Sequence, residues 1–171
     1  MKLLSIDVGT KNLAYCLFQD GNVVDWNVET IPCCATNITK VVDYLKETFP
    51  DDLDTVVIEK QPARNVKMRM METILSTFFI MYGVPKVVQY SSKHKLGNIG
   101  KTAKGKTNYT LRKKMGVAMC GMYIREHETD NWITKFQSSK KKDDLSDCLL
   151  QGLSYAGFDI NRLSTSIMSL S

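Results

Sequence analysis

This sequence of 171 residues lacks the patterns that place a chain in a membrane or around a zinc ion. No stretch is long and apolar enough to span a bilayer, and residues 1–20 carry charges in place of a signal-peptide pattern. The cysteines form no CxxC pair and have no nearby histidine, so neither a zinc site nor a disulfide framework is expected. We therefore expect a soluble, intracellular protein with no membrane partner. Its five cysteines are predicted to be reduced packing residues: Cys16, Cys33, Cys34, Cys120 and Cys148.

Internal repeats and a second domain are also missing, and the chain is predicted to be a single globular domain, 1–171. Apolar periodicity predicts strands near 2–8, 13–19, 22–28, 54–59 and 86–90, and helices from Asn37, over 65–82, over 108–127 and from Asp144 to Ala156. A hairpin is expected at Asp20-Gly21. A three-stranded meander followed by alternating helices and strands predicts an α/β fold, a mixed five-stranded sheet flanked by helices.

Charge is segregated along the chain. Residues 86–142 carry 14 Lys and Arg against 3 Asp and Glu, a net charge of +11, whereas residues 1–85 and 143–171 each carry a net charge of −3. Such a basic segment is typical of a protein that binds nucleic acid, with a well-solvated surface as the alternative. A long loop over 91–107 and the following helix supply the predicted DNA-binding residues: Lys93, Lys95, Lys101, Lys104, Lys106, Arg112 and Lys113.

Four carboxylates stand at the ends of the predicted elements. Asp7 lies inside an apolar run, Glu59 ends another, and Asp144 and Asp147 are three residues apart at the start of the last helix. Each has a structural alternative: a strand-end turn for Asp7, a solvated strand end for Glu59, and for the last pair capping of the helix N-terminus, with Asp143 or Asp144 as the cap. Because an ionised carboxylate in an apolar setting needs a cation or a hydrogen-bond donor, the four together predict a catalytic site for Mg²⁺. Two such ions in one active site would hydrolyse a phosphodiester.

Three segments resemble the acidic motifs of RuvC-type Holliday-junction resolvases, which have a ribonuclease-H-like fold. They are Ser5-Ile6-Asp7-Val8-Gly9-Thr10-Lys11-Asn12-Leu13-Ala14-Tyr15, Val57-Ile58-Glu59-Lys60-Gln61 and Lys142-Asp143-Asp144-Leu145-Ser146-Asp147. The order, the spacing and the near full-length coverage match. The residues of the first and last motifs are most similar to those of the mitochondrial and poxvirus branches. We therefore expect a member of the poxvirus branch, acting in the host cytoplasm.

The resemblance implies a role for each acid. Asp7 would bridge both metal ions, Glu59 would bind one, and Asp144 and Asp147 would complete the shell, with Mn²⁺ expected to substitute for Mg²⁺. Asp143 stands where bacterial relatives often have a histidine, which leaves its part in the metal shell open.

Bacterial relatives also use a lysine from the segment after the fifth strand. Lys93 is the nearest positional match in this sequence, with Lys95 and Lys101 as rivals. The sequence does not decide among the three.

The implied activity is a Mg²⁺-dependent DNA endonuclease that resolves four-way and related branched DNA junctions by symmetric paired incisions, without a nucleotide cofactor. Two-fold symmetric cutting implies a homodimer. The helix over 65–82 is the expected interface, because it has more apolar residues than one buried face needs. These residues are Met68, Met70, Met71, Ile74, Leu75, Phe78, Phe79 and Met81.

Three rival functions remain to be weighed. The segment Ile6-Asp7-Val8-Gly9-Thr10 also resembles the first phosphate motif of actin-like ATPases and sugar kinases, but this chain is too short for two lobes and shows no convincing second motif. An inactive nucleic-acid-binding module would explain the basic segment but not the four acids. A ribonuclease H acting on RNA–DNA hybrids shares the fold and the metals, and a comparison of junction and hybrid cleavage separates it.

Overall fold

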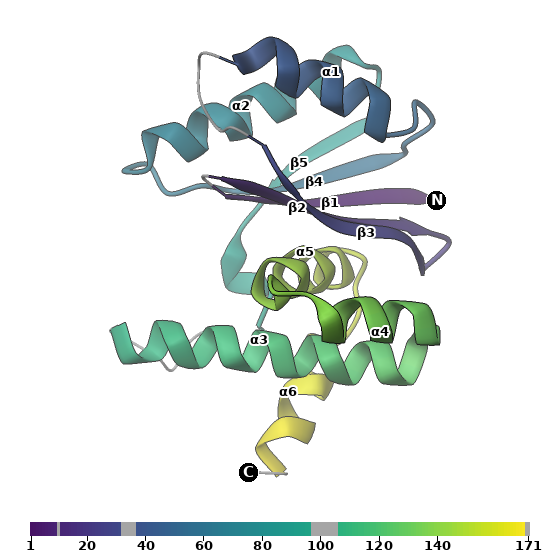
Figure 1. The fold of residues 1–171 in the computed structure, drawn as a ribbon, viewed down its shortest axis with the longest axis vertical. Coiled ribbons are helices and arrows are strands. Elements are labelled where there is room, and N and C mark those ends of the chain that lie inside the picture. Colours follow the sequence, from purple (N-terminus) through teal and green to yellow (C-terminus); the bar gives the residue numbers. More distant parts are fainter. Residues whose placement is uncertain (10, 32–36, 97–105, 170–171) are drawn as a thin grey trace.

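The structure is a computed structural model that describes residues 1–9, 11–31, 37–96 and 106–169. A five-stranded sheet crosses the molecule in the order β3-β2-β1-β4-β5 (Figure 1). Strand β1 pairs with β2 in antiparallel and with β4 in parallel orientation; β2 and β3 are antiparallel, and β4 and β5 are parallel. The predicted mixed five-stranded sheet is confirmed. Its strands are β1 (Lys2–Val8), β2 (Asn12–Gln19), β3 (Asn22–Thr30), β4 (Thr55–Glu59) and β5 (Lys86–Tyr90).

The predicted hairpin joins β2 to β3. Asp20 and Gly21 have positive φ angles of 52° and 88°. Two successive residues in this conformation make the turn whose twist matches that of antiparallel strands, which is why Asp-Gly is favoured there.

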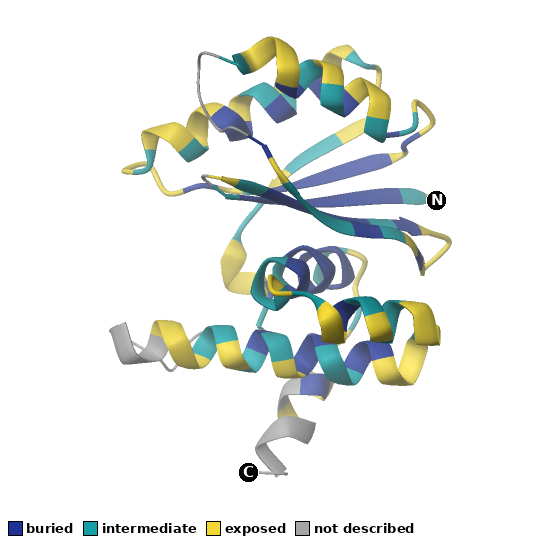
Figure 2. Cartoon of the chain, in the orientation of Figure 1, coloured by how far each residue is buried: buried dark blue, intermediate teal, exposed yellow. Residues whose placement is uncertain are grey.

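Helices cover both faces of the sheet and enclose two apolar cores. Helices α1 and α2 lie on one face, and α5 lies on the other, with α3 and α4 packed beyond α5 and α6 beyond α3 (Figure 1). Helix α5 is buried along most of its length because it lies between the sheet and α3 (Figure 2). The helices are α1 (Ile38–Thr48), α2 (Val66–Met81), α3 (Lys106–His127), α4 (Asp130–Ser138), α5 (Lys142–Tyr155) and α6 (Ile160–Ser169).

Several helix details differ from the sequence predictions. Helices α4 and α6 were not predicted; α4 is short, and it is held by tertiary packing, with Phe136 stacked on Trp26 at a centroid distance of 5.5 Å. Asn37 precedes α1 but makes no capping hydrogen bond through its side chain. The residue that precedes α5 is Lys141, so neither of the acids proposed as its cap occupies that position.

The cysteines and the helix lengths bear on two further expectations. Cys16, Cys120 and Cys148 are buried free thiols in one of the two cores, and Cys33 and Cys34 lie outside the described residues. Over the part of the chain that is described, every helix is too short or too polar to cross a membrane.

Candidate active site

Alternation along two parallel strands places two carboxylates on the same face of the sheet. Asp7 stands one residue before the end of β1, and Glu59 ends β4. Parallel neighbours have their carboxyl ends at the same edge, and side chains two residues apart share a face. Leu3 and Val57, which share that face with the two acids, pack in the core beneath α5. Asp7 and Glu59 therefore lie together on the α5 side of the sheet edge.

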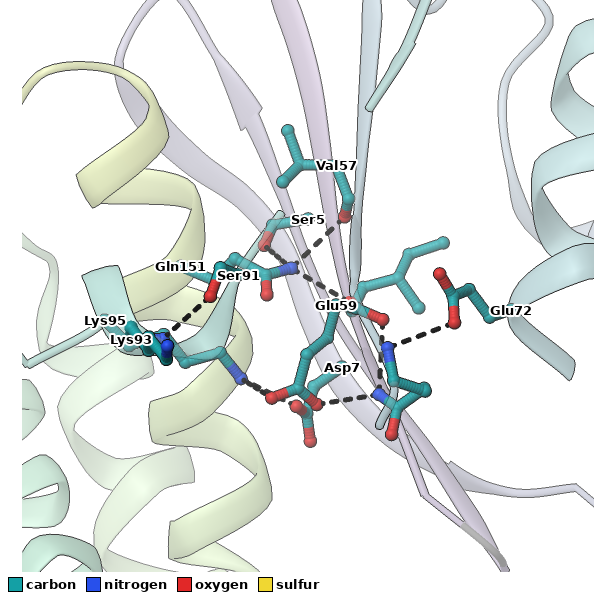
Figure 3. Close-up of polar contacts among 11 residues, drawn as sticks. Ser5, Asp7, Val57, Glu59, Glu72, Ser91, Lys93, Lys95 and Gln151 are labelled. Carbon is teal, nitrogen blue, oxygen red and sulfur yellow. Dashed lines mark hydrogen bonds and ion pairs between the residues drawn. The ribbon is translucent and has the colours of Figure 1, made fainter. Parts of the chain in front are cut away.

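A buried lysine joins these two carboxylates. Lys95 directly follows the short 3-10 helix η2 (Ser92–His94) after β5, and it is 3% exposed. Its Nζ lies 2.8 Å from Oδ1 of Asp7 and 3.1 Å from Oε1 of Glu59 (Figure 3). The ammonium group of Lys95 is thus buried against two carboxylates, and the DNA contact expected of Lys95 stays a prediction. Of the three lysines left open by the sequence, Lys95 lies at the acids, Lys93 is exposed, and Lys101 lies outside the described residues.

Helix α5 approaches the sheet closely enough to bring its first turns to the same edge. Gln151 is fully buried, and its Nε2 donates to the carbonyl oxygen of Ile6 at 2.9 Å and to Oγ of Ser5 at 3.2 Å. The next residue, Gly152, faces Phe18, and a Cβ atom at this glycine would lie only 2.3 Å from that ring. A residue without a side chain is therefore required where α5 crosses β2.

The two acids of α5 lie one and two turns before this docking point. Asp147 is four residues before Gln151 and Asp144 is seven before it, so they lie on the same side of the helix. Asp144 accepts a hydrogen bond from Nδ2 of Asn12 at 3.3 Å. The sheet edge and α5 thus bring together all four predicted site residues. We refer to Asp7, Glu59, Asp144 and Asp147 as the acid cluster.

Asp143 points to a different partner. Its Oδ2 lies 2.6 Å from Nζ of Lys113 on α3. This ion pair ties α3 to the start of α5, and the DNA contact expected of Lys113 stays a prediction. The pair also lowers the pKa of Asp143, against the effect of its partial burial.

Burial and crowding of like charges shift the pKa values of the acid cluster. Burial, followed by the charge of Asp7, raises the pKa of Glu59 to about 8, and burial raises that of Asp147 to about 6. Burial is the largest single effect on Asp7 and would raise its pKa, but the charge of Lys95 and the hydrogen bonds from Glu59 and Lys95 together hold that pKa below its ordinary value. In turn, the neighbouring carboxylates raise the pKa of Lys95 despite its burial. The single ammonium group of Lys95 therefore does not neutralise all four carboxylates, because the pKa values of Glu59 and Asp147 stay raised in its presence.

These shifts predict how stability depends on pH in the absence of metal. Because the pKa of Glu59 is about 8 in the folded protein and 4.5 ordinarily, the folded state binds more protons than the unfolded state between these values. Stability should therefore fall as the pH rises from about 5 to 8, by on the order of a few kcal/mol. Urea unfolding in EDTA at several pH values measures this, and Glu59→Gln should flatten the curve. A wild-type curve as flat as that of the variant would contradict the prediction.

The donor chemistry of the acid cluster fits a hard divalent cation, because every candidate ligand is a carboxylate oxygen. As the side chains stand, no three carboxylates, imidazoles or thiols of the described chain are grouped closely enough to hold one ion. The ammonium group of Lys95 lies between Asp7 and Glu59 instead. Binding of a cation therefore requires these side chains to turn toward it.

The remaining predicted DNA-binding residues are only partly described. Lys93 is exposed and Arg112 is half-buried. Lys106 begins α3, whereas Lys101 and Lys104 lie outside the described residues. The sequence prediction omitted Lys114 and Lys140, which are exposed.

Residues 1–162 match the family model described as "Poxvirus A22 protein". Among curated proteins, the chain is 30% identical to the uncharacterized protein L451 of Acanthamoeba polyphaga mimivirus, over 74% of this chain and 34% of that protein. The chain thus spans about a third of the length of this relative.

Two solved structures share the fold. The fowlpox virus resolvase in complex with substrate Holliday junction DNA has a TM-score of 0.66 and 24% sequence identity, covering 92% of this chain and 97% of that chain. RuvC of T. thermophilus in complex with a Holliday junction substrate has a TM-score of 0.55 and 18% identity, covering 91% and 93%. The predicted RuvC-like, ribonuclease-H-like fold is confirmed.

Proposed function

The chain belongs to the Poxvirus A22 protein family, and from this premise we propose that it is a metal-dependent endonuclease that resolves four-way DNA junctions. The observation that carries the proposal is the acid cluster, with Asp7 buried and the other three carboxylates half-buried, together with a segment of net charge +11. Carboxylates hold the metal ions of phosphodiester hydrolysis, and cations neutralise a phosphate backbone. The chain therefore combines the two requirements of a nuclease.

The acid cluster would hold two Mg²⁺ ions, with Mn²⁺ as a substitute. Bound metal would supply a water of lowered pKa and positive charge at the scissile phosphate. Asp7 and Glu59 would provide ligand oxygens from the sheet, and Asp144 and Asp147 from α5. Lys95 would keep a positive charge and a hydrogen-bond donor beside Asp7. We propose no nucleotide cofactor.

Cleavage of a synthetic four-way junction tests the proposal. The protein should cut the junction in Mg²⁺ and in Mn²⁺, not in EDTA, and should cut linear duplex DNA far more slowly. Faster cleavage of an RNA–DNA hybrid would support a ribonuclease H in place of a resolvase. Tight junction binding without cleavage in either metal would indicate an inactive binding module.

The DNA path is proposed to follow exposed cations of the basic segment, among them Lys93 after β5 and Lys114 on α3. Neutralising Lys93 and Lys114 should weaken junction binding. It should also reduce the slope of log K against log salt concentration by about two, because each lost phosphate contact means that about one fewer counterion is released on binding. Binding measured at several salt concentrations gives this slope. The matched control is Lys40→Gln with Lys46→Gln on α1, two exposed lysines on the other side of the sheet. Equal slopes for both pairs would move the DNA path elsewhere.

A homodimer is proposed because paired incision requires two active sites at a fixed separation. Helix α2 buries four of the eight apolar residues that the sequence assigned to the interface, namely Met71, Leu75, Phe78 and Phe79, in the core of one chain. Of those eight residues only Met70 and Met81 are exposed, and the helix also exposes Val66 and Ile80, which the sequence prediction left out. We refer to Val66, Met70, Ile80 and Met81 as the apolar stripe; with the exposed Thr73 and Thr77 between them, they lie along one side of the helix.

Charged substitutions within the apolar stripe test the dimer. Met70→Glu with Ile80→Glu should drive the protein toward monomer, because a two-fold contact would place like charges opposite each other. Light scattering gives the mass, and the ratio of nicked to doubly cut junction reports paired incision. Val24→Glu, at a 46% exposed residue of β3, is the control. A dimer that survives both substitutions would place the interface on another surface.

A further inference from the structure

Helix α2 carries a buried carboxylate on the face that packs in the core. Glu72 is 4% exposed and lies between Met71 and Leu75, two residues of the apolar core under α1 and α2. Replacing a buried charged group by a well-packed apolar residue is often neutral or stabilising. Stability alone therefore does not account for a glutamate at this position.

The contacts of Glu72 lead to the acid cluster in two steps (Figure 3). Oε2 of Glu72 accepts a hydrogen bond from the backbone N–H of Gln61 at 3.0 Å. The side chain of Gln61 in turn donates from Nε2 to Oε2 of Glu59 at 3.0 Å and to its carbonyl oxygen at 3.2 Å. Gln61 is 6% exposed; its backbone bond to Glu72 is buried, and its side-chain bonds to Glu59 are partly buried.

Glu59 is consequently held at both of its carboxylate oxygens. Gln61 binds Oε2, and Nζ of Lys95 lies 3.1 Å from Oε1. The backbone at Gln61 needs support for this, because it lies just beyond β4. Lys60 still donates to the carbonyl oxygen of Tyr90 on β5. The next backbone N–H, that of Gln61, donates its hydrogen bond to Glu72.

We propose that Glu72 is a positioning residue that orients Glu59 through Gln61 for metal binding. The inference rests on the proposed function, because it assumes that Glu59 is a metal ligand. Residues that hydrogen-bond to metal-ligating carboxylates set their orientation, and their loss typically weakens metal binding or activity by about 10–100-fold. The same helix carries the apolar stripe on its exposed side, so one helix serves both the metal ligand and the dimer contact.

Three variants separate positioning from a structural role. Glu72→Met removes the acceptor for the Gln61 amide, Gln61→Ala removes the donor to Glu59, and Glu72→Gln keeps a side-chain oxygen that accepts the same bond. The first two should weaken Mn²⁺ binding to the DNA-free protein by about 10–100-fold, measured by electron paramagnetic resonance, whereas Glu72→Gln should stay close to wild type. The Mg²⁺ concentration for half-maximal junction cleavage should rise in parallel.

A double variant and a stability control complete the experiment. Glu72→Met combined with Gln61→Ala should bind Mn²⁺ no more weakly than Gln61→Ala alone, because both changes break one path. Leu75→Ala, a core substitution on the same helix, should lower the unfolding free energy yet leave the Mn²⁺ affinity of the folded protein unchanged. Wild-type affinity in Glu72→Met, or an equal loss in Leu75→Ala, would overturn the proposal. Absence of both Mn²⁺ binding and cleavage in the wild type would instead refute the proposed function, and this inference with it.

Discussion

Replacing Asp7 by Asn should lower the rate of four-way junction cleavage by about 10²–10³-fold at saturating Mg²⁺. The amide keeps the size of the side chain but removes the negative charge that a metal ion and Lys95 would share. Junction binding should change little, because the phosphate backbone is expected to contact the basic segment and not the acids. Single-turnover cleavage with excess protein separates the two effects.

The control for this substitution is an exposed aspartate far from the acid cluster. Asp51→Asn changes the net charge by the same amount at an exposed residue between α1 and β4. Its cleavage rate should match that of the wild type. If Asp7→Asn also cleaved at the wild-type rate, Asp7 would have no essential part in the reaction.

Replacing Lys95 by Met should destabilise the metal-free protein by about 3–5 kcal/mol at pH 8, because it leaves buried carboxylates without their cation. The loss should shrink near pH 5, where Glu59, whose pKa is about 8, is already protonated. Added Mg²⁺ should restore part of the stability, since the metal replaces the missing charge. Urea unfolding at both pH values, in EDTA and in Mg²⁺, measures each part.

Lys93 provides the matched comparison for this variant. It stands two residues before Lys95 but is exposed, so Lys93→Met should change the unfolding free energy by less than about 0.5 kcal/mol. Equal effects of the two substitutions would show that Lys95 does not neutralise the acid cluster. A loss for Lys95→Met that is independent of pH would point to packing in place of charge.

Much of the fold could be predicted from the sequence because its strong signals are local. The apolar runs that form β1 and β4, the Asp-Gly turn and the apolar period of α5 each depend on neighbouring residues, and all lie close to their predicted bounds. The positions of Asp7 and Glu59 follow from these strands, since parallel neighbours end at the same edge. The roles of the four acids stay predictions.

Contacts between residues far apart in the chain could not be predicted. Nothing local to Lys95 distinguishes it from Lys93, because its burial depends on the chain turning at η2 toward Asp7, 88 residues away in sequence. Glu72 was hidden within an apolar helix for the same reason, since its acceptor role depends on Gln61. Helix α4 was missed because it is short and its aromatic residues Trp132 and Phe136 pack on Trp26 of β3, a contact that the local sequence does not indicate.

Contacts at Gln151 and Gly152 fix α5 against the sheet, so any tilt of the helix would pivot about this point. At 1.5 Å per residue, Asp147 stands about 6 Å and Asp144 about 10 Å from that point. A tilt of about 10° would move these two carboxylates by roughly 1 Å and 2 Å, and displacements of 1 Å in an active site can reduce rates about 10²-fold. A methyl group at Gly152 would clash with Phe18 and push the helix away from the sheet at the pivot, although this residue makes no contact with the acids. The geometry of the proposed metal site therefore depends on a close contact between α5 and the sheet, one to two helical turns away from the two acids, where there is no room for a side chain.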